Sequence, residues 1–128
     1  MGAEIIPLHA HEDAALDTTR ILVLRQSLGD QRCREIVDEV VYHLTDRLTQ
    51  LELAFAEQDM AQLLGLASRL AGLSEQVGLA DFARVARDLR ACIEAEDPIA
   101  TGAVAARLLR LGEDSLFSVM LYADQSAL

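Results

Sequence analysis

The chain has 128 residues, of which 52% are hydrophobic and only 4% aromatic, and its formal net charge is −10. A chain of this length forms one domain of ordinary size. Its negative charge argues against nucleic acid and anionic membrane surfaces as partners, because both attract basic patches. We expect a cytoplasmic protein, because the sequence has neither a signal-peptide pattern nor the run of roughly 18 apolar residues that spans a bilayer.

Helix-forming residues dominate the sequence, and only two prolines interrupt it, which predicts an all-α domain. The two cysteines, Cys33 and Cys92, lie far apart without metal-binding spacing, so we expect two free, reduced thiols. All eleven basic residues are arginines.

Residues 1–12 are interpreted as a flexible tail. His9, His11, Glu12 and Asp13 lie close enough in the chain to bind a metal loosely. A single cluster of this kind without a second set of ligands is more typical of a solvated tail. We therefore predict no metal site and no cofactor.

A short first helix is predicted from Asp13 to about Gln26. Its candidate core residues are Leu16, Ile21, Leu24 and Leu28. Gly29 suits the position that follows a helix, and Asp30 suits the N-cap of the next one.

The second helix is predicted from about Gln31 to Glu57, because apolar residues recur there at spacings of three and four. These residues are Val37, Val40, Val41, Leu44, Leu48, Leu51 and Phe55. His43 lies at the edge of this stripe, where we expect a half-buried or solvated side chain.

The central helix is predicted from Met60 to Val77, with Asp59 as its N-cap and Gly78 as the glycine that ends it. One face carries the apolar side chains of Leu63, Leu66, Leu70, Leu73 and Val77. The opposite face carries the small residues Ala61, Gly65, Ser68 and Gly72. A glycine inside a helix costs about 1 kcal/mol relative to alanine. Either a closely packed helix or a docking partner would explain two glycines on one face.

The fourth helix is predicted from about Asp81 to Ala95. Its apolar face carries Phe82, Val85, Leu89, Cys92 and Ile93. Arg84, Arg87 and Arg90 lie off that face. They are either solvated residues in local ion pairs, such as Arg84 with Asp88, or a basic patch for an acidic partner.

The last helix is predicted from Pro98 to Tyr122, with Asp97 as its N-cap. Its candidate core residues are Val104, Leu108, Leu111, Phe117, Val119 and Leu121. We expect Gly102 and Gly112 to loosen or bend it and residues 124–128 to fray. Together, residues 13–123 are predicted to form an up-down antiparallel four-helix bundle with a short additional N-terminal helix.

The central helix resembles that of histidine-containing phosphotransfer (HPt) domains, which reads roughly Ala-His-x-Leu-Lys-Gly-x-x-x-x-x-Gly. Ala67, Leu70, Gly72 and Gly78 match this pattern. The phosphoacceptor histidine is replaced by Ser68 and the helper lysine by Ala71. The resemblance extends over about residues 16–120 and implies an HPt-like bundle from two-component phosphorelay signalling.

Serine is a poor replacement for the phosphoacceptor, because a serine phosphate ester is too stable to return its phosphoryl group to an aspartate. A serine also needs a neighbouring base, and Ala71 and Gly72 offer none, while Glu75 lies a further turn away. Arg69 lies about 100° around the helix from Ser68, so it is poorly aimed to replace the lysine. The resemblance therefore implies a pseudo-HPt domain that is not an enzyme and binds a receiver domain or a histidine kinase.

The predicted partner-binding residues are Ala61, Gly65, Ser68, Arg69, Gly72, Gln76 and Arg84. Two alternatives remain open. The protein could be an active phosphotransfer protein that uses His43, His9 or His11 as acceptor. It could instead be a structural or oligomerisation module whose small-residue face is a subunit interface.

Overall fold

The computed structural model describes residues 16–126, which form five helices and no strand. The helices are α1 (Thr18–Leu28), α2 (Asp30–Ala56), α3 (Met60–Gln76), α4 (Ala80–Glu94) and α5 (Pro98–Ser126). The all-α prediction is confirmed. No helix within this range is long and apolar enough to cross a membrane.

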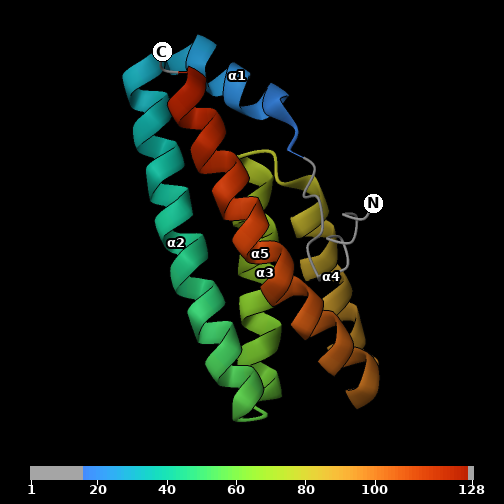
Figure 1. The fold of residues 1–128 in the computed structure, drawn as a ribbon. Coiled ribbons are helices and arrows are strands. Elements are labelled where there is room, and N and C mark those ends of the chain that lie inside the picture. Colours follow the sequence, from blue (N-terminus) through green and yellow to red (C-terminus); the bar gives the residue numbers. More distant parts are fainter. Residues whose placement is uncertain (1–15, 127–128) are drawn as a thin grey trace, which may run out of the picture.

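The four longer helices enclose one hydrophobic core (Figure 1). α2 packs against α3 and α5, and α4 packs against the same two helices, so the contacts close into a ring. Each of the four contributes fully buried side chains, among them Leu44, Leu70, Leu89 and Leu108. The apolar faces expected for α2, α3 and α4 thus meet inside the ring.

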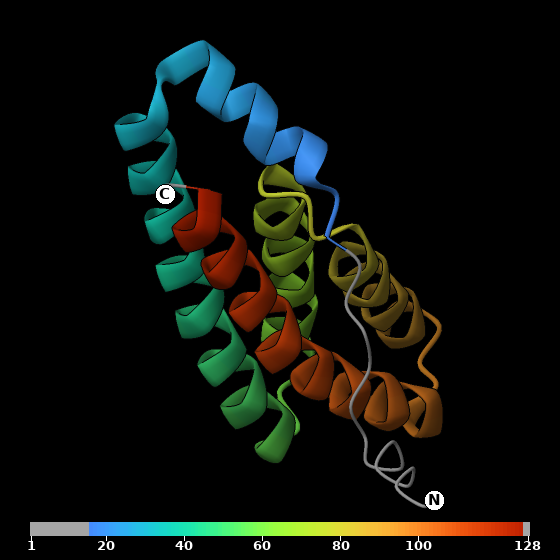
Figure 2. The ribbon, with the colours of Figure 1, turned by 45° about the horizontal axis from the view of Figure 1, so that its top comes forward.

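α1 lies across one end of the other helices and packs on α2 (Figures 1 and 2). The backbone N–H of Asp17 donates to the carbonyl of Gly78, in the turn between α3 and α4, over 2.8 Å. Arg20 Nε donates to the carbonyl of Glu75 over 3.2 Å. α1 therefore connects α2 with the α3–α4 turn.

The described part of α1 differs from its prediction at both ends. The helix begins at Thr18 because the Asp17 carboxylate accepts a hydrogen bond from the Thr19 N–H over 3.0 Å; residues 13–15 lie outside the described residues. It ends at Leu28, whose side chain is 48% exposed rather than in the core. Asp30 does not cap α2: it is the first helical residue, and its carboxylate pairs with Arg25 over 3.4 Å.

The predicted caps of the other helices are largely confirmed. The carboxylates of Asp59 and Asp97 accept hydrogen bonds from the backbone N–H groups of Gln62 (3.1 Å) and Ala100 (3.0 Å). Gly78 follows α3 with φ 82°. A Cβ at this position would overlap the carbonyl oxygen of Asp17, so glycine is needed both for the backbone angle and for the close approach of α1.

The apolar stripe of α2 is confirmed, with each member buried or half-buried. The prediction for α5 is wrong at Phe117 and Leu121, which are exposed by 66% and 43%. Phe117 follows Leu108 by nine residues, which at 100° per residue places it on the opposite side of the helix. α5 also continues beyond the predicted end at Tyr122, to Ser126.

α5 changes direction along its length (Figure 2), and Gly112 also has a packing role. A Cβ there would lie 2.7 Å from Cδ1 of Leu48, so this glycine allows α5 to pack closely on α2. Both cysteines are free thiols, Cys33 buried and Cys92 half-buried.

Candidate functional site

The outward face of α3 carries the residues that we call the small-residue strip: Ala61, Gly65, Ser68 and Gly72. Ala61, Ser68 and Gly72 are exposed, and Gly65 is half-buried. A Cβ built at Gly65 or Gly72 would meet no atom within 4 Å. Among the described residues, no helix packs closely on this strip, so packing within residues 16–126 does not explain the two glycines.

The surroundings of Ser68 do not activate its hydroxyl group. Its Oγ accepts a hydrogen bond from Nη1 of Arg90, on α4, over 3.4 Å. The carboxylate of Glu75, considered above as a distant base, pairs instead with the guanidinium of Arg87. A guanidinium stays protonated and cannot accept the serine proton. Ala71, at the position expected for a helper lysine, is only 6% exposed.

The three arginines on α4 are all paired with carboxylates. Arg84 pairs with Asp81 over 3.2 Å, rather than with Asp88 as predicted. Arg90 pairs with Glu94 over 3.3 Å, and Arg87 with Glu75 as described above. Local ion pairing, one of the two interpretations that the sequence left open, therefore describes the geometry of this row.

The other side of the strip borders a hollow between α2 and α3, which we call the α2–α3 hollow. It is lined by His43, Arg47, Arg69, Gly72, Leu73 and Gln76. The structure thus brings together three predicted partner-binding residues, Arg69, Gly72 and Gln76, on this side of α3. Arg84 does not line the hollow, and Ala61 and Gly65 lie further towards the start of α3.

Two cationic side chains of the hollow differ in their contacts. Arg69 has neither an ion pair nor a hydrogen bond with any other residue in the described range 16–126. Arg47 pairs through Nη1 with Asp46 over 2.7 Å, and its Nε is buried with no hydrogen-bond partner among those residues. His43 is exposed, and its ring meets that of Tyr42 edge-on at a centroid distance of 5.4 Å.

Arg47 was missed by the sequence analysis. It follows His43 by four residues, so the two share one face of α2, and this spacing was the available signal. His9 and His11, the other proposed acceptors, lie outside the described residues. Within residues 16–126, no group of three His, Cys, Asp or Glu side chains could hold a metal ion.

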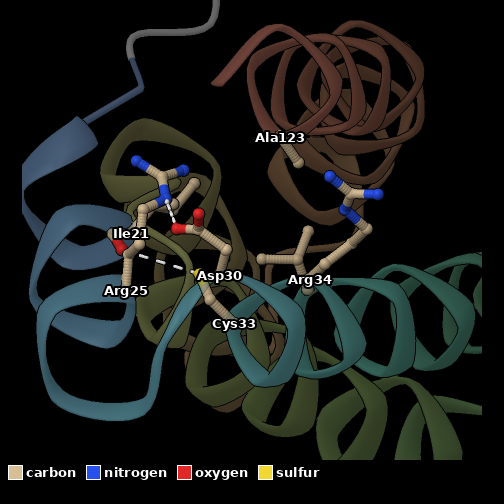
Figure 3. Close-up of a pocket in the computed structure, with 7 residues that line it drawn as sticks. Ile21, Arg25, Asp30, Cys33, Arg34 and Ala123 are labelled. Carbon is tan, nitrogen blue, oxygen red and sulfur yellow. Dashed lines mark hydrogen bonds and ion pairs between the residues drawn. The ribbon is translucent and has the colours of Figure 1, made fainter. Parts of the chain in front are cut away.

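A second hollow lies where α1, α2 and α5 meet (Figure 3). It is lined by Ile21, Arg25, Asp30, Cys33, Arg34, Val37 and Ala123. The thiol of Cys33 donates to the carbonyl of Ile21 over 3.7 Å, beside the ion pair of Arg25 with Asp30. None of the predicted site residues lies here, and the contacts connect α1 to α2.

No protein-family model matches this chain, and neither a curated protein nor a solved structure does. The resemblance to HPt domains therefore depends on the residues quoted above, and the functional argument depends on the geometry of the α3 face.

Proposed function

We propose that this protein is a pseudo-HPt domain of two-component signalling, which docks a response-regulator receiver domain or a histidine kinase without carrying phosphate. In this proposal, α2 to α5 form an up-down antiparallel four-helix bundle of the HPt type, and α1 is an additional helix. The ring of contacts among these four helices supports that arrangement. The observation that carries the functional proposal is the largely exposed small-residue strip on α3, whose two glycines have open space at Cβ.

The strip supports docking because its two glycines lack a structural reason within the described residues. Each costs about 1 kcal/mol relative to alanine in a helix interior. Neither Gly65 nor Gly72 has a neighbour that a methyl group would displace. The approach of a second protein to the α3 backbone would account for both, since a flat surface permits close contact.

The chemistry at Ser68 supports docking without phosphoryl transfer. The hydroxyl contacts a guanidinium, and the nearest carboxylate of α3, that of Glu75, is engaged by Arg87. While these contacts hold, neither the guanidinium nor the Glu75 carboxylate can act as a general base for the serine. The buried Ala71 supplies no charge to stabilise a phosphoryl group.

The first test is an affinity capture from the native cell lysate with wild type, Gly72→Arg and Ala103→Arg. Because Gly72 is exposed and has free space at Cβ, we expect the Gly72→Arg variant to retain the fold. Ala103 is exposed on α5, which lies across the ring from α3, so Ala103→Arg adds the same side chain elsewhere. Circular dichroism checks that both variants remain folded.

We expect wild type and Ala103→Arg to capture a receiver domain or a histidine kinase, identified by mass spectrometry, and Gly72→Arg to lose it. Equal capture of that partner by all three proteins would reject the docking face. Capture of neither class by wild type would reject the two-component assignment.

The same strip also fits a second copy of this chain, since a flat helix face suits either a partner or a subunit interface. Sedimentation over a range of concentrations separates the two hypotheses. A dimer that dissociates in Gly65→Leu would favour the oligomerisation module, whereas a monomer at all concentrations would reject it.

A further inference from the structure

The α2–α3 hollow differs in charge from the rest of this face. The chain as a whole carries a formal charge of −10, and the α4 arginines are each paired with a carboxylate. Arg69 has no such partner within the described range, although it is exposed. The positive charge of Arg69, which is unpaired among residues 16–126, therefore lies on the α2 side of the small-residue strip.

The donors around the hollow suit an anion with two or more oxygen atoms. Arg69 offers a planar guanidinium, the group that binds carboxylates and phosphates with two parallel hydrogen bonds. Arg47 also lines the hollow and places a second guanidinium beside Arg69. Its Nη1 pairs with the carboxylate of Asp46, which also accepts a hydrogen bond from Nε2 of Gln50 over 2.8 Å.

The remaining lining residues leave room for the anion. Gly72 contributes no side chain to the hollow, and a Cβ there would have no neighbour within 4 Å. The amide of Gln76 can donate a further hydrogen bond, and His43 can donate through a ring N–H. Leu73 provides the apolar part of the lining.

We propose that the α2–α3 hollow is an anion-binding site that receives an acidic side chain of the docked protein. The part of this inference that concerns the docked protein rests on the proposed function. The net charge of −10 repels a polyanion such as nucleic acid. A single carboxylate of a partner is repelled less, because it interacts mainly with the donors that line the hollow. The hollow would thereby orient a partner whose backbone lies against the strip.

Inorganic phosphate is the probe for the site in the free protein. It is titrated into 15N-labelled protein at constant ionic strength, with sodium chloride as the compensating salt, and backbone amide shifts are followed by NMR. We expect saturable shifts centred on residues 43, 47, 69, 72 and 76. Arg69→Gln should weaken the affinity by about two- to fivefold, the range of an exposed charge interaction.

Arg32→Gln is the matched control. Arg32 is an exposed arginine of α2 that pairs with Glu35 over 3.1 Å and does not line the hollow. It should leave the phosphate affinity unchanged. Shifts that spread over the surface, increase linearly without saturation, or persist equally in Arg69→Gln would overturn the inference.

The same variants are then used in the affinity capture. Reduced capture by Arg69→Gln, together with full capture by Arg32→Gln, supports an acidic contact from the partner. If Arg69→Gln captures the receiver or kinase as well as wild type, while Gly72→Arg loses it, this inference is overturned and the docking proposal stands. If phosphate binds but wild type captures neither class, the anion site stands and the proposed function fails.

Discussion

The guanidinium of Arg90, on α4, donates a hydrogen bond over 3.4 Å to the hydroxyl of Ser68, on α3. This contact places beside the serine oxygen a permanent cation, which cannot accept the hydroxyl proton. Ser68 is thus held as a polar surface group of the α3 face, which is the basis of the first prediction.

Wild-type protein should accept no phosphoryl group from a phosphorylated receiver domain, whereas Ser68→His should gain acid-labile, base-stable phosphate. The exchange places an imidazole on the exposed face of α3, and imidazole forms a phosphoramidate that can be reached from an aspartyl phosphate. Transfer is measured with radiolabelled receiver, and Ser68→Ala serves as the control.

The alternative acceptor is tested in the same assay. Acid-labile phosphate on wild-type protein that disappears in His43→Gln would show an active phosphotransfer protein and would contradict the pseudo-HPt proposal. His43 is exposed and borders the α2–α3 hollow, so a receiver on the strip would have access to it.

Gly65→Ala and Gly72→Ala should each raise the free energy of unfolding by about 1 kcal/mol, measured by urea denaturation. A methyl group at either position meets no atom within 4 Å, so the gain in helix propensity is not offset. Gly112→Ala should gain less, because its Cβ would lie 2.7 Å from Cδ1 of Leu48 and that side chain must move. Equal gains at all three positions would contradict this explanation.

Gly78→Ala should destabilise the protein more than Gly29→Ala. Both glycines have positive φ angles, 82° and 87°, and this backbone strain costs about 1–3 kcal/mol for other residues. A Cβ at Gly29 would meet nothing within 4 Å, whereas one at Gly78 would overlap the Asp17 carbonyl oxygen. We expect an additional loss of at least about 1 kcal/mol at Gly78, from the disrupted hydrogen bond with Asp17. Similar losses in the two variants would show that the α1 contact contributes little.

Asp59→Ala and Asp97→Ala should each lower the free energy of unfolding by about 1 kcal/mol, because each removes the acceptor for a backbone N–H at a helix start. Asp88→Ala is the control, since Asp88 is an exposed acid in the middle of α4 and should change stability by less than about 0.5 kcal/mol. Equal effects of all three changes would point to overall charge rather than capping.

The helix boundaries could be predicted where a local signal fixes them. Asp59, Asp97 and Gly78 act through hydrogen bonds or backbone angles within a few residues, and these are readable from the sequence. Asp30 was misassigned because Gly29 alone separates α1 from α2, so Gly29 occupies the N-cap position. Phe117 was wrongly assigned to the core because it is apolar, although its position lies on the opposite side of the helix from Leu108.

The outward direction of the small-residue strip could also be predicted, since it depends only on angles around one helix. The α2–α3 hollow could not, because it requires the relative register of Arg47 and Arg69 on two different helices. On α4, Arg84 has an acidic residue before it, Asp81, and another after it, Asp88. It pairs with Asp81, one turn earlier, in keeping with the tilt of helical side chains towards the N-terminus.

The thiol of Cys33 is 2% exposed where α1 covers α2, with its hydrogen bond directed to the carbonyl of Ile21 (Figure 3). Reaction of this thiol with an alkylating reagent therefore requires a local opening where α1, α2 and α5 meet, and the rate of alkylation reports the free energy of that opening. Cys92 is half-buried on α4 and provides an internal reference that does not depend on α1. The unmodified chain thus contains a protected thiol that reports local opening at the α1 end and a more accessible thiol on α4 for comparison.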